Sequence, residues 1–576
     1  MQHRGPIAAI AASGPYVATA GYDNQVIVWS ADRREALSRG LHDHLVNHCA
    51  FNSQGSLLVS ASSDYSARVW EVPSMRLRAC LLGHSDDVDM AVFSPDDRLI
   101  ATCALDLTIR IFDLSGTCLS LLSGHTGNII SVAWTRDGKG LVSCGVDGTI
   151  REWDATKGCE TRCTDLSGVR TDTLVIDADG RIFAGDDDGR IVTIIDGEAS
   201  FIEAHKAGIK KITYDEVSRR LVSLSYDRSL AIWQVKGTRE LVEVSRDIFP
   251  ALVWARSAAL LDSHRIAVGT FGSTYAIYDS LTRTWDLDGI VADPSLNAVT
   301  VLDDAVYAIG DAGVLKRNGQ EVGKTGSLCN FLLAGAERLY TGGQLGCLFD
   351  ARTGEVLYQH HSPLNCATSF LRNGISHLAI GAYTGEALIF AEGTGGRLDL
   401  VDALPLHDNA IKGLASCKGR LFSVCANTSI AWHDVSDFRE VRRVRKAHER
   451  IANGCCRIGE GFASIGRDLK LRLWFEDRDD VYQTPHPNSV KCIAASEDGR
   501  WLMTGAYTGT VAGFDMASKE FVSFQRLTAS GISSLAFEAG KDRFLASAYD
   551  GVIYPVARPS TRSQGLMSSL SVRSAA

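Results

Sequence analysis

The stretch LVSCGVDGTIREWD, from Leu141 to Asp154, decides the fold of this 576-residue chain. It contains two short runs of alternating apolar and polar residues joined by Asp147-Gly148, and an Asp-Gly pair between such runs is the strongest short-range signal for a β-hairpin. Another alternating run opens at Ile129, 18 residues before Asp147. The segment therefore predicts at least three short antiparallel strands, with a fourth, weaker outer strand after Trp153.

The aspartate of this hairpin recurs along the chain, six residues before an aromatic residue. The pairs are Asp23 with Trp29, Asp64 with Trp70, Asp106 with Phe112, Asp147 with Trp153 and Asp227 with Trp233. The first four aspartates are 41 or 42 residues apart, and one four-stranded propeller blade takes roughly 40 to 45 residues. Each repeat therefore predicts one blade of a β-propeller.

The repeats resemble those of the WD40 family. The resemblance rests on a Gly-His pair, a Ser or Thr, the turn Asp and a terminal Trp-Asp, and it covers nearly the whole chain. It implies a buried structural tetrad in each strong repeat. The tetrads that it assigns are His42, Ser60, Asp64 and Trp70; His125, Ser143, Asp147 and Trp153; His205, Ser223, Asp227 and Trp233; and His448, Ser464, Asp468 and Trp474.

The recurrence of these Ser, His and Asp sets argues against a catalytic role. An active site is needed once, whereas the set returns in blade after blade. A carboxylate that holds an imidazole, a hydroxyl and turn amides satisfies buried polar groups in each of them. We therefore predict no catalytic residue and no cofactor, and consider an enzyme the less favoured interpretation.

Weaker repeats continue in the same register toward the C-terminus. Their turn positions, added to the first five, make fourteen, and they fall at Asp188, Gly272, Ala312, Leu345, Thr384, Asn427, Asp468, Thr508 and Asp550. Seven-bladed rings are the commonest WD40 arrangement, so the resemblance implies an all-β fold of two WD40-type β-propellers in tandem, each with seven four-stranded blades. The expected bounds are 1–289 and 290–558, followed by a Ser- and Arg-rich tail, 559–576.

Both ends of the predicted array raise the question of how the rings close. Met1 lies only a few residues before the first inner strand, which leaves no room for an N-terminal strand that closes the ring from the far side. In the tail, Leu566, Ser568, Leu570 and Val572 alternate. We therefore predict that residues 565–573 supply the outer strand of the fourteenth blade.

Composition limits the class of protein. A hydrophobic content of 45% with 22% charged residues is normal for a folded soluble chain, and a net charge of −9 argues against a general nucleic-acid binder. No apolar run approaches the ~18 residues of a membrane-spanning helix. The fifteen cysteines are odd in number and scattered, which favours a reducing, cytoplasmic compartment.

Histidines offer weak candidates for a metal site. His44 and His48 would face the same side if both lay on one strand, and His360 and His361 form the next densest group. Because isolated strand histidines are more often packed or surface residues than ligands, we predict no metal.

The family pattern implies that function lies on the top face of each ring, around its channel. This face presents two kinds of residue: the one before each turn Asp, and those beside the first apolar residue of the inner strand. The first ring offers an aromatic arc with an acidic side opposite, formed by Tyr22, Tyr226, Phe271, Asp87, Asp89, Arg170 and Asp172. The second offers an aromatic and basic face, suited to an acidic or phosphate-bearing ligand, formed by Tyr383, Lys412, Arg467, Lys491, Tyr507 and Tyr549.

Three functions remain open from the sequence. Exposed Tyr and Arg side chains are typical of interaction hot spots, so the favoured interpretation is a non-catalytic scaffold that binds partner proteins or peptides through both top faces. The second is an enzyme or enzyme-complex subunit in bacterial small-molecule biosynthesis, such as the toxoflavin pathway, with a site in a propeller channel. The third is a tandem-propeller cytoskeletal regulator.

Overall fold

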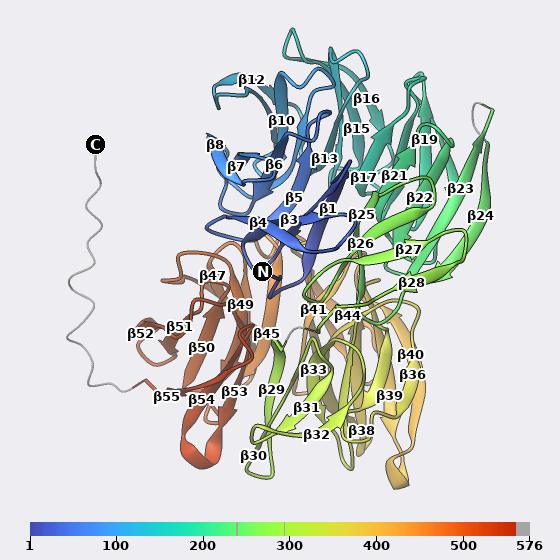
Figure 1. Cartoon of the computed structure of the whole chain (residues 1–576). Helices are drawn as coiled ribbons and strands as arrows, with labels where there is room; N and C mark the ends of the chain where they lie inside the picture. The colour runs from blue at the N-terminus through green and yellow to red at the C-terminus, as the bar shows by residue number, and fades with distance from the viewer. Residues whose placement is uncertain (238–239, 293, 560–576) are drawn as a thin grey trace, which may run out of the picture. The chain divides into compact units, whose positions relative to one another are not determined.

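The computed structural model describes residues 1–237, 240–292 and 294–559 (Figure 1). The chain divides into two compact units, Met1–Asp293 and Pro294–Ala576. Each unit carries seven antiparallel sheets, called here blades 1–7 and blades 8–14. Consecutive strands of the chain form each sheet, so every blade is a four-stranded or three-stranded meander.

Blade 4 shows why the repeat folds as it does. Its strands are β13 (Ile129–Trp134), β14 (Gly140–Gly145), β15 (Thr149–Asp154) and β16 (Cys159–Asp165). Leu141 lies opposite Trp153, so the predicted hairpin is present in its expected register. Gly148 has a φ of 72°, and a Cβ atom there would lie 2.6 Å from the backbone of Gly168. Only glycine fits this turn without strain.

The first strand of each blade lines the centre of its ring. First strands of consecutive blades lie side by side, and the last returns to the first, β25 to β1 and β53 to β29. Both units are therefore closed seven-bladed propellers. In the first propeller these inner strands are β1 (Ile7–Ser13), β5 (Val46–Phe51), β9 (Val88–Phe93), β13, β17 (Thr171–Ile176), β21 (Ile209–Asp215) and β25 (Val253–Leu260). In the second they are β29 (Leu296–Leu302), β33 (Cys329–Ala334), β37 (Leu364–Arg372), β41 (Ile411–Cys417), β45 (Ala452–Ile458), β49 (Val490–Ala495) and β53 (Ile532–Glu538).

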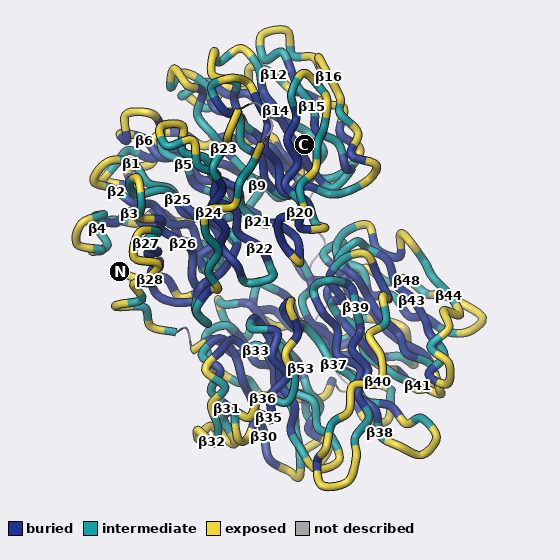
Figure 2. Tube along the Cα trace, turned by 90° about the vertical axis from the view of Figure 1, so that its right-hand side faces the viewer, coloured by how far each residue is buried: buried dark blue, intermediate teal, exposed yellow. Residues whose placement is uncertain are grey.

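The hydrophobic core of each propeller lies between neighbouring blades. Val59 and Val69 of blade 2, for example, pack in one cluster with Ile100 and Phe112 of blade 3. Burial is deepest in the second strands of the blades, whereas the outer strands, loops and turns are the most exposed (Figure 2). Each blade is thus sandwiched by its neighbours, which makes the ring a rigid frame for the loops at its two ends.

The first propeller closes without a strand borrowed from the N-terminus, as expected from the sequence. Strands β1 to β4 (Ala36–Leu41) all belong to blade 1, and the junction is made by packing. Ile10 and Trp29 share an apolar cluster with Tyr275 of blade 7. The Ile10 amide also donates a hydrogen bond to Ser257 Oγ at 2.8 Å.

Blade 14 departs from the expected four strands. In the described chain it consists of β53, β54 (Arg543–Ala548) and β55 (Ile553–Ala557). The outer strand predicted at residues 565–573 lies outside the described residues. Ser295 Oγ of blade 8 donates a hydrogen bond to the Tyr549 carbonyl at 2.7 Å, across the junction that closes this ring.

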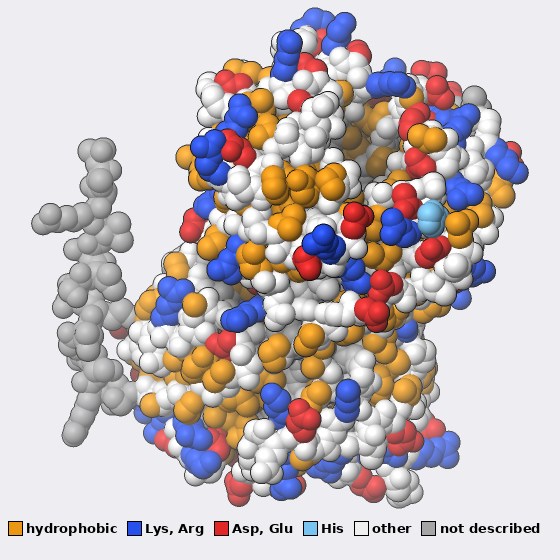
Figure 3. All heavy atoms as spheres, viewed as in Figure 1, with side chains coloured by type: hydrophobic (Ala, Val, Ile, Leu, Met, Phe, Trp, Pro, Cys, Tyr) orange, Lys and Arg blue, Asp and Glu red, His pale blue; other side chains and the backbone are white. Residues whose placement is uncertain are grey.

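The cysteines, the helical segments and the charged side chains complete the description of the fold. All fifteen cysteines are free thiols. Apart from strands, the described residues form two single-turn segments, η1 (Thr394–Gly396) and η2 (Ala539–Lys541), and none of their helices could cross a membrane. On the face that Figure 3 shows, acidic and basic side chains are interspersed.

Candidate functional site

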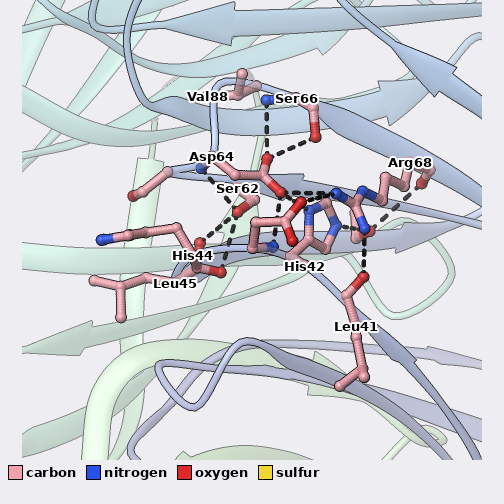
Figure 4. Close-up of polar contacts among 12 residues, drawn as sticks. Leu41, His42, His44, Leu45, Ser62, Asp64, Ser66, Arg68 and Val88 are labelled. Atoms are coloured by element: carbon pink, nitrogen blue, oxygen red, sulfur yellow. Dashed lines mark hydrogen bonds and ion pairs between the residues drawn. The ribbon is translucent and has the colours of Figure 1, made fainter. Parts of the chain in front are cut away.

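The buried tetrad of blade 2 is a closed set of hydrogen bonds. Figure 4 shows its Asp64 carboxylate with His42, Ser66 and Arg68. His42 Nδ1 lies 2.9 Å from the Asp64 carboxylate and His42 Nε2 lies 2.7 Å from Ser60 Oγ, while Trp70 Nε1 donates to the same hydroxyl at 2.8 Å. Burial disfavours the Asp64 carboxylate, but hydrogen bonds from His42 and Ser66 outweigh it and hold the pKa below its usual value. Both ring nitrogens of His42 are occupied, so it has no free nitrogen to act as a general base.

The same bonds recur where the sequence assigned tetrads, in blades 4, 6 and 12. They also occur in two blades for which the sequence analysis named no tetrad. Blade 1 uses His3, Thr19, Asp23 and Trp29, and blade 3 uses His84, Thr102 and Asp106. In both of these blades the hydroxyl partner is a threonine, whereas all four assigned tetrads carry a serine.

The second residue of most inner strands sits in a β-bulge. In β21, β41 and β49 the pairing shifts between the first and third residues, which leaves Lys210, Lys412 and Lys491 as the extra residues. A bulge turns its extra side chain out of the regular alternation of the strand. These side chains gather at one end of the channel, where the inner strands begin and the turn aspartates lie. We call this end the mouth of each propeller.

Asparagine occupies this bulge in four blades of the second propeller, and the sequence analysis did not recognise it. Each side-chain amide donates a hydrogen bond to the carbonyl of the first residue in the next inner strand, at 2.7 to 3.1 Å. The four residues are Asn297, Asn330, Asn365 and Asn453. These bonds tie neighbouring blades together around the channel. The Asn repeated at the second position of these four inner strands was the available signal.

The mouth of the second propeller brings together the six side chains predicted for that face. They are Tyr383, Lys412, Arg467, Lys491, Tyr507 and Tyr549, all half-buried. Lys412 Nζ lies 4.5 Å from the centre of the Tyr383 ring, and Lys491 Nζ lies 5.9 Å from that of Tyr507. The Tyr507 and Tyr549 rings stack with their centres 6.3 Å apart. The result is a mouth of three cations set among three aromatic rings.

The two lysines of the second mouth have no carboxylate partner among the described residues. Neither Lys412 nor Lys491 forms an ion pair with any residue that the structure describes. Burial and the neighbouring Lys491 ammonium lower the pKa of Lys412 to about 8. Burial disfavours the Tyr507 phenolate, yet Lys491, Arg467 and Lys412 outweigh it and lower the pKa of Tyr507. Mutual repulsion of this kind favours an incoming anion.

The mouth of the first propeller has the opposite arrangement. Lys210 Nζ lies 2.6 Å from the Asp172 carboxylate and 2.5 Å from that of Asp187, and 5.0 Å from the centre of the Tyr226 ring. Burial opposes the Lys210 charge, but Asp172 and then Asp187 outweigh it and raise the pKa of the ammonium. The predicted acidic side is therefore compensated by Lys210. The Arg170 carbonyl accepts a hydrogen bond from the Asp187 amide at 3.0 Å, which holds the backbone on this side of the mouth.

The aromatic side of the first mouth is built around Trp254. Its ring lies 5.5 Å from that of Tyr22 and 5.2 Å from that of Phe271. Phe271 is only 5% exposed, so it packs against Trp254 and offers little surface to a partner. Arg256 lies 5.7 Å from the Trp254 ring, and the Tyr22 phenol raises the pKa of its guanidinium. The sequence analysis missed both Trp254 and Arg256.

Two of the acidic residues predicted for the first mouth lie on blade 3. Asp89 is the bulge residue of β9, and its carboxylate helps to raise the pKa of the Arg256 guanidinium. Asp87 stands just before that strand, and its carbonyl accepts the Leu105 amide at 2.9 Å. Both side chains are half-buried.

The histidine candidates for a metal site divide into two cases. His44 precedes β5 whereas His48 lies within it, so the two histidines do not share one strand. His48 Nδ1 lies 3.2 Å from the Ala91 carbonyl, and burial lowers its pKa to about 3. His360, His361 and Glu386 offer ligand atoms within 4.8 Å of one another.

His360 also has a structural explanation. Its Nε2 lies 3.3 Å from Glu386, whose carboxylate takes the place of the Asp partner found in the tetrads. The ring of His360 thus takes part in the same kind of His-carboxylate contact as the tetrads. This contact explains the grouping of His360 with Glu386 without an ion.

Comparison with known proteins finds matches to the repeats. A family model described as WD domain, G-beta repeat, matches residues 1–30, 37–71, 75–113, 116–154 and 480–515. A model described as Strictosidine synthase-like, N-terminal, matches residues 173–194 of blade 5.

Two curated relatives share local similarity with the chain. The Ribosome biogenesis protein WDR12 homolog of Chlamydomonas reinhardtii is 30% identical over 108 residues, which cover 17% of this chain and 24% of the relative. The WD repeat-containing protein 26 homolog of Arabidopsis thaliana is 36% identical over 75 residues, covering 12% of this chain and 13% of the relative. The chain thus spans no more than about a quarter of the length of either relative.

Proposed function

Because this chain belongs to the WD40-repeat family, we propose that it is a non-catalytic scaffold that binds partner proteins through the mouths of its two propellers. We further propose that the second mouth takes an acidic or phosphate-bearing segment of a partner. WD repeats and WD-repeat relatives support a role in protein interaction generally. The choice of ligand rests on the geometry of the mouths.

The observation that carries this proposal is the charge contrast between equivalent lysines. Lys210, Lys412 and Lys491 are each the bulge residue of an inner strand. Two carboxylates hold Lys210, whereas Lys412 and Lys491 form no ion pair within the described chain. Uncompensated, partly buried ammonium groups beside tyrosine hydroxyls favour an anionic group that accepts several hydrogen bonds, as a phosphate does.

The asparagine ties strengthen the case. Four blades of the second propeller use the bulge position to hold the ring together, whereas blades 11 and 13 place a lysine there and forgo the tie. A lysine side chain at this position adds like charge to the mouth, which costs stability. A binding role for Lys412 and Lys491 accounts for that cost.

Partner recovery tests the scaffold proposal. Affinity purification followed by quantitative mass spectrometry would compare the wild type with Tyr507→Ala and Tyr226→Ala, which each remove one ring from one mouth. We expect each variant to lose a different subset of partners, because buried aromatic rings dominate interface energies. Recovery of the same partners by both variants as by the wild type would show that the mouths are not the binding faces.

The second mouth should bind anions in a pH-dependent way. Lys412 is protonated below its pKa of about 8 and loses its charge as the pH rises through that value. Phosphate monoesters keep their charge above pH 7, since their second pKa is about 6. We therefore expect affinity for a phosphopeptide to fall between pH 7 and pH 9 at constant ionic strength. The same titration with Lys412→Asn should lose most of this dependence, and an unchanged profile would exclude Lys412 from the site.

A further inference from the structure

The centre of the first propeller holds a cavity of about 560 Å³. Six of the seven inner strands line it, namely β1, β9, β13, β17, β21 and β25, mainly through the parts of these strands farthest from the mouth. Fifteen of its nineteen lining residues are apolar, with Met90, Trp134, Leu174 and Leu260 among them. Both the volume and the apolar wall are typical of small-molecule sites, which occupy about 300 to 1,000 Å³.

One cation, Lys211, faces this cavity. It is half-buried in β21, directly after Lys210, and belongs to the cavity lining. Because successive strand residues point to opposite sides, the bulge at Lys210 sends that side chain to the mouth and leaves Lys211 in the channel. Lys211 Nζ forms no hydrogen bond or ion pair with any residue that the structure describes.

None of the described groups that face Lys211 forms an ion pair with it. His48 and Cys49 of β5 interact with it electrostatically, but burial lowers the pKa of His48 to about 3 and raises that of Cys49 to about 12, so both are neutral at pH 7. Glu216 also lines the cavity, but it is exposed and accepts the Ala178 amide at 3.2 Å. Burial lowers the pKa of Lys211 itself. An ammonium in this setting lacks a partner that a ligand could provide.

We propose that the channel of the first propeller binds a small amphiphilic carboxylate, such as a medium-chain fatty acid. Its carboxylate pairs with Lys211, and its alkyl chain lies against the apolar wall formed by the half-buried side chains of Met90, Val92, Ala133 and Val175. The apolar wall selects the chain and the single cation selects the head group. This site is separate from both mouths and does not depend on the scaffold role.

Displacement of a fluorescent fatty acid tests the site in the full-length protein. The probe is 11-(dansylamino)undecanoic acid, whose emission rises in apolar surroundings, and decanoate and decanamide are the competitors. We expect saturable binding of one probe per chain. Lys211→Met should weaken decanoate binding roughly tenfold to hundredfold, the loss of one charge-assisted hydrogen bond, and leave decanamide binding unchanged. Lys211→Arg should keep most of the decanoate affinity.

Two further variants separate the cavity from the surface. Thr213→Trp fills the channel from the same side of β21 as Lys211 and should abolish binding of both competitors. Lys206→Met removes an exposed lysine and should change nothing. Circular dichroism confirms that each variant is folded, and the unchanged decanamide affinity confirms an intact cavity in Lys211→Met. The proposal is overturned by absent or unsaturable probe binding in the wild type, by equal decanoate affinity in Lys211→Met, or by probe binding that survives Thr213→Trp.

Discussion

Replacing Asp468 with alanine is expected to lower the free energy of unfolding of the second propeller by about 3–5 kcal/mol, because it leaves several buried hydrogen-bond donors without their acceptor. Both Asp468 carboxylate oxygens lie 3.0 Å from His448 Nδ1, and the Asp468 side chain is 1% exposed. The carboxylate also accepts the amides of Glu449 and Lys470 at 3.1 and 3.3 Å. The variant leaves all of these donors without their acceptor.

The matched control is the aspartate at the same turn position of blade 5. The Asp188 side chain is 62% exposed and, among the described residues, pairs only with Arg190, at 3.3 Å. Asp188→Ala should therefore cost less than about 1 kcal/mol. Urea unfolding, followed by tryptophan fluorescence and by peptide-resolved hydrogen exchange, assigns each loss to one propeller. Equal losses in the two variants would refute the structural role of the buried aspartates.

Replacing Lys412 and Lys491 together with asparagine is expected to weaken phosphopeptide binding roughly hundredfold or more. Each lysine would contribute about 1.5–3 kcal/mol as a charged donor, and 1.4 kcal/mol corresponds to a factor of ten. Asparagine is the residue that four other blades of this propeller carry at the same bulge, so the fold should persist. The measurement is a calorimetric titration with the strongest peptide from a degenerate library with a central phosphoserine.

Two controls make that titration specific. The variant Lys446→Asn/Lys519→Asn removes the same net charge from exposed positions of the second propeller and should bind like the wild type. A library with alanine in place of phosphoserine should bind weakly to every variant. If the Lys412→Asn/Lys491→Asn variant bound phosphopeptide as tightly as the wild type, the second mouth would not be an anion site.

Much of the fold could be predicted from one spacing, the 41 or 42 residues between successive turn aspartates. The turn aspartate sets the register of the hairpin, so the residue before it and the start of the next inner strand can be located by counting. That is why all six residues of the second mouth, from Tyr383 to Tyr549, were predicted and do lie together. Hairpins and alternating strands are local features, and local features can be predicted from a single sequence.

Contacts between blades were much harder to predict. The ion pairs of Lys210 with Asp172 and Asp187 join neighbouring blades. Nothing in the local sequence pattern shows that these charged groups are in contact. Trp254 was missed because blade 7 lacks the turn aspartate and because β25 pairs irregularly between Val253 and Ala258, which defeats counting. The cavity beside Lys211 likewise exists only once seven strands surround a channel.

The most direct test of the central claim, that partners bind at the mouths, is photo-crosslinking from within one blade. The photoreactive residue p-benzoylphenylalanine would replace either Tyr507, at the mouth, or Phe524, which is 39% exposed on the outer strand β52 (Glu520–Arg526) of the same blade. We predict covalent capture of partner protein from position 507 and none from position 524. Capture from position 524 alone would contradict this account and place the binding surface on the outer edge of the blade.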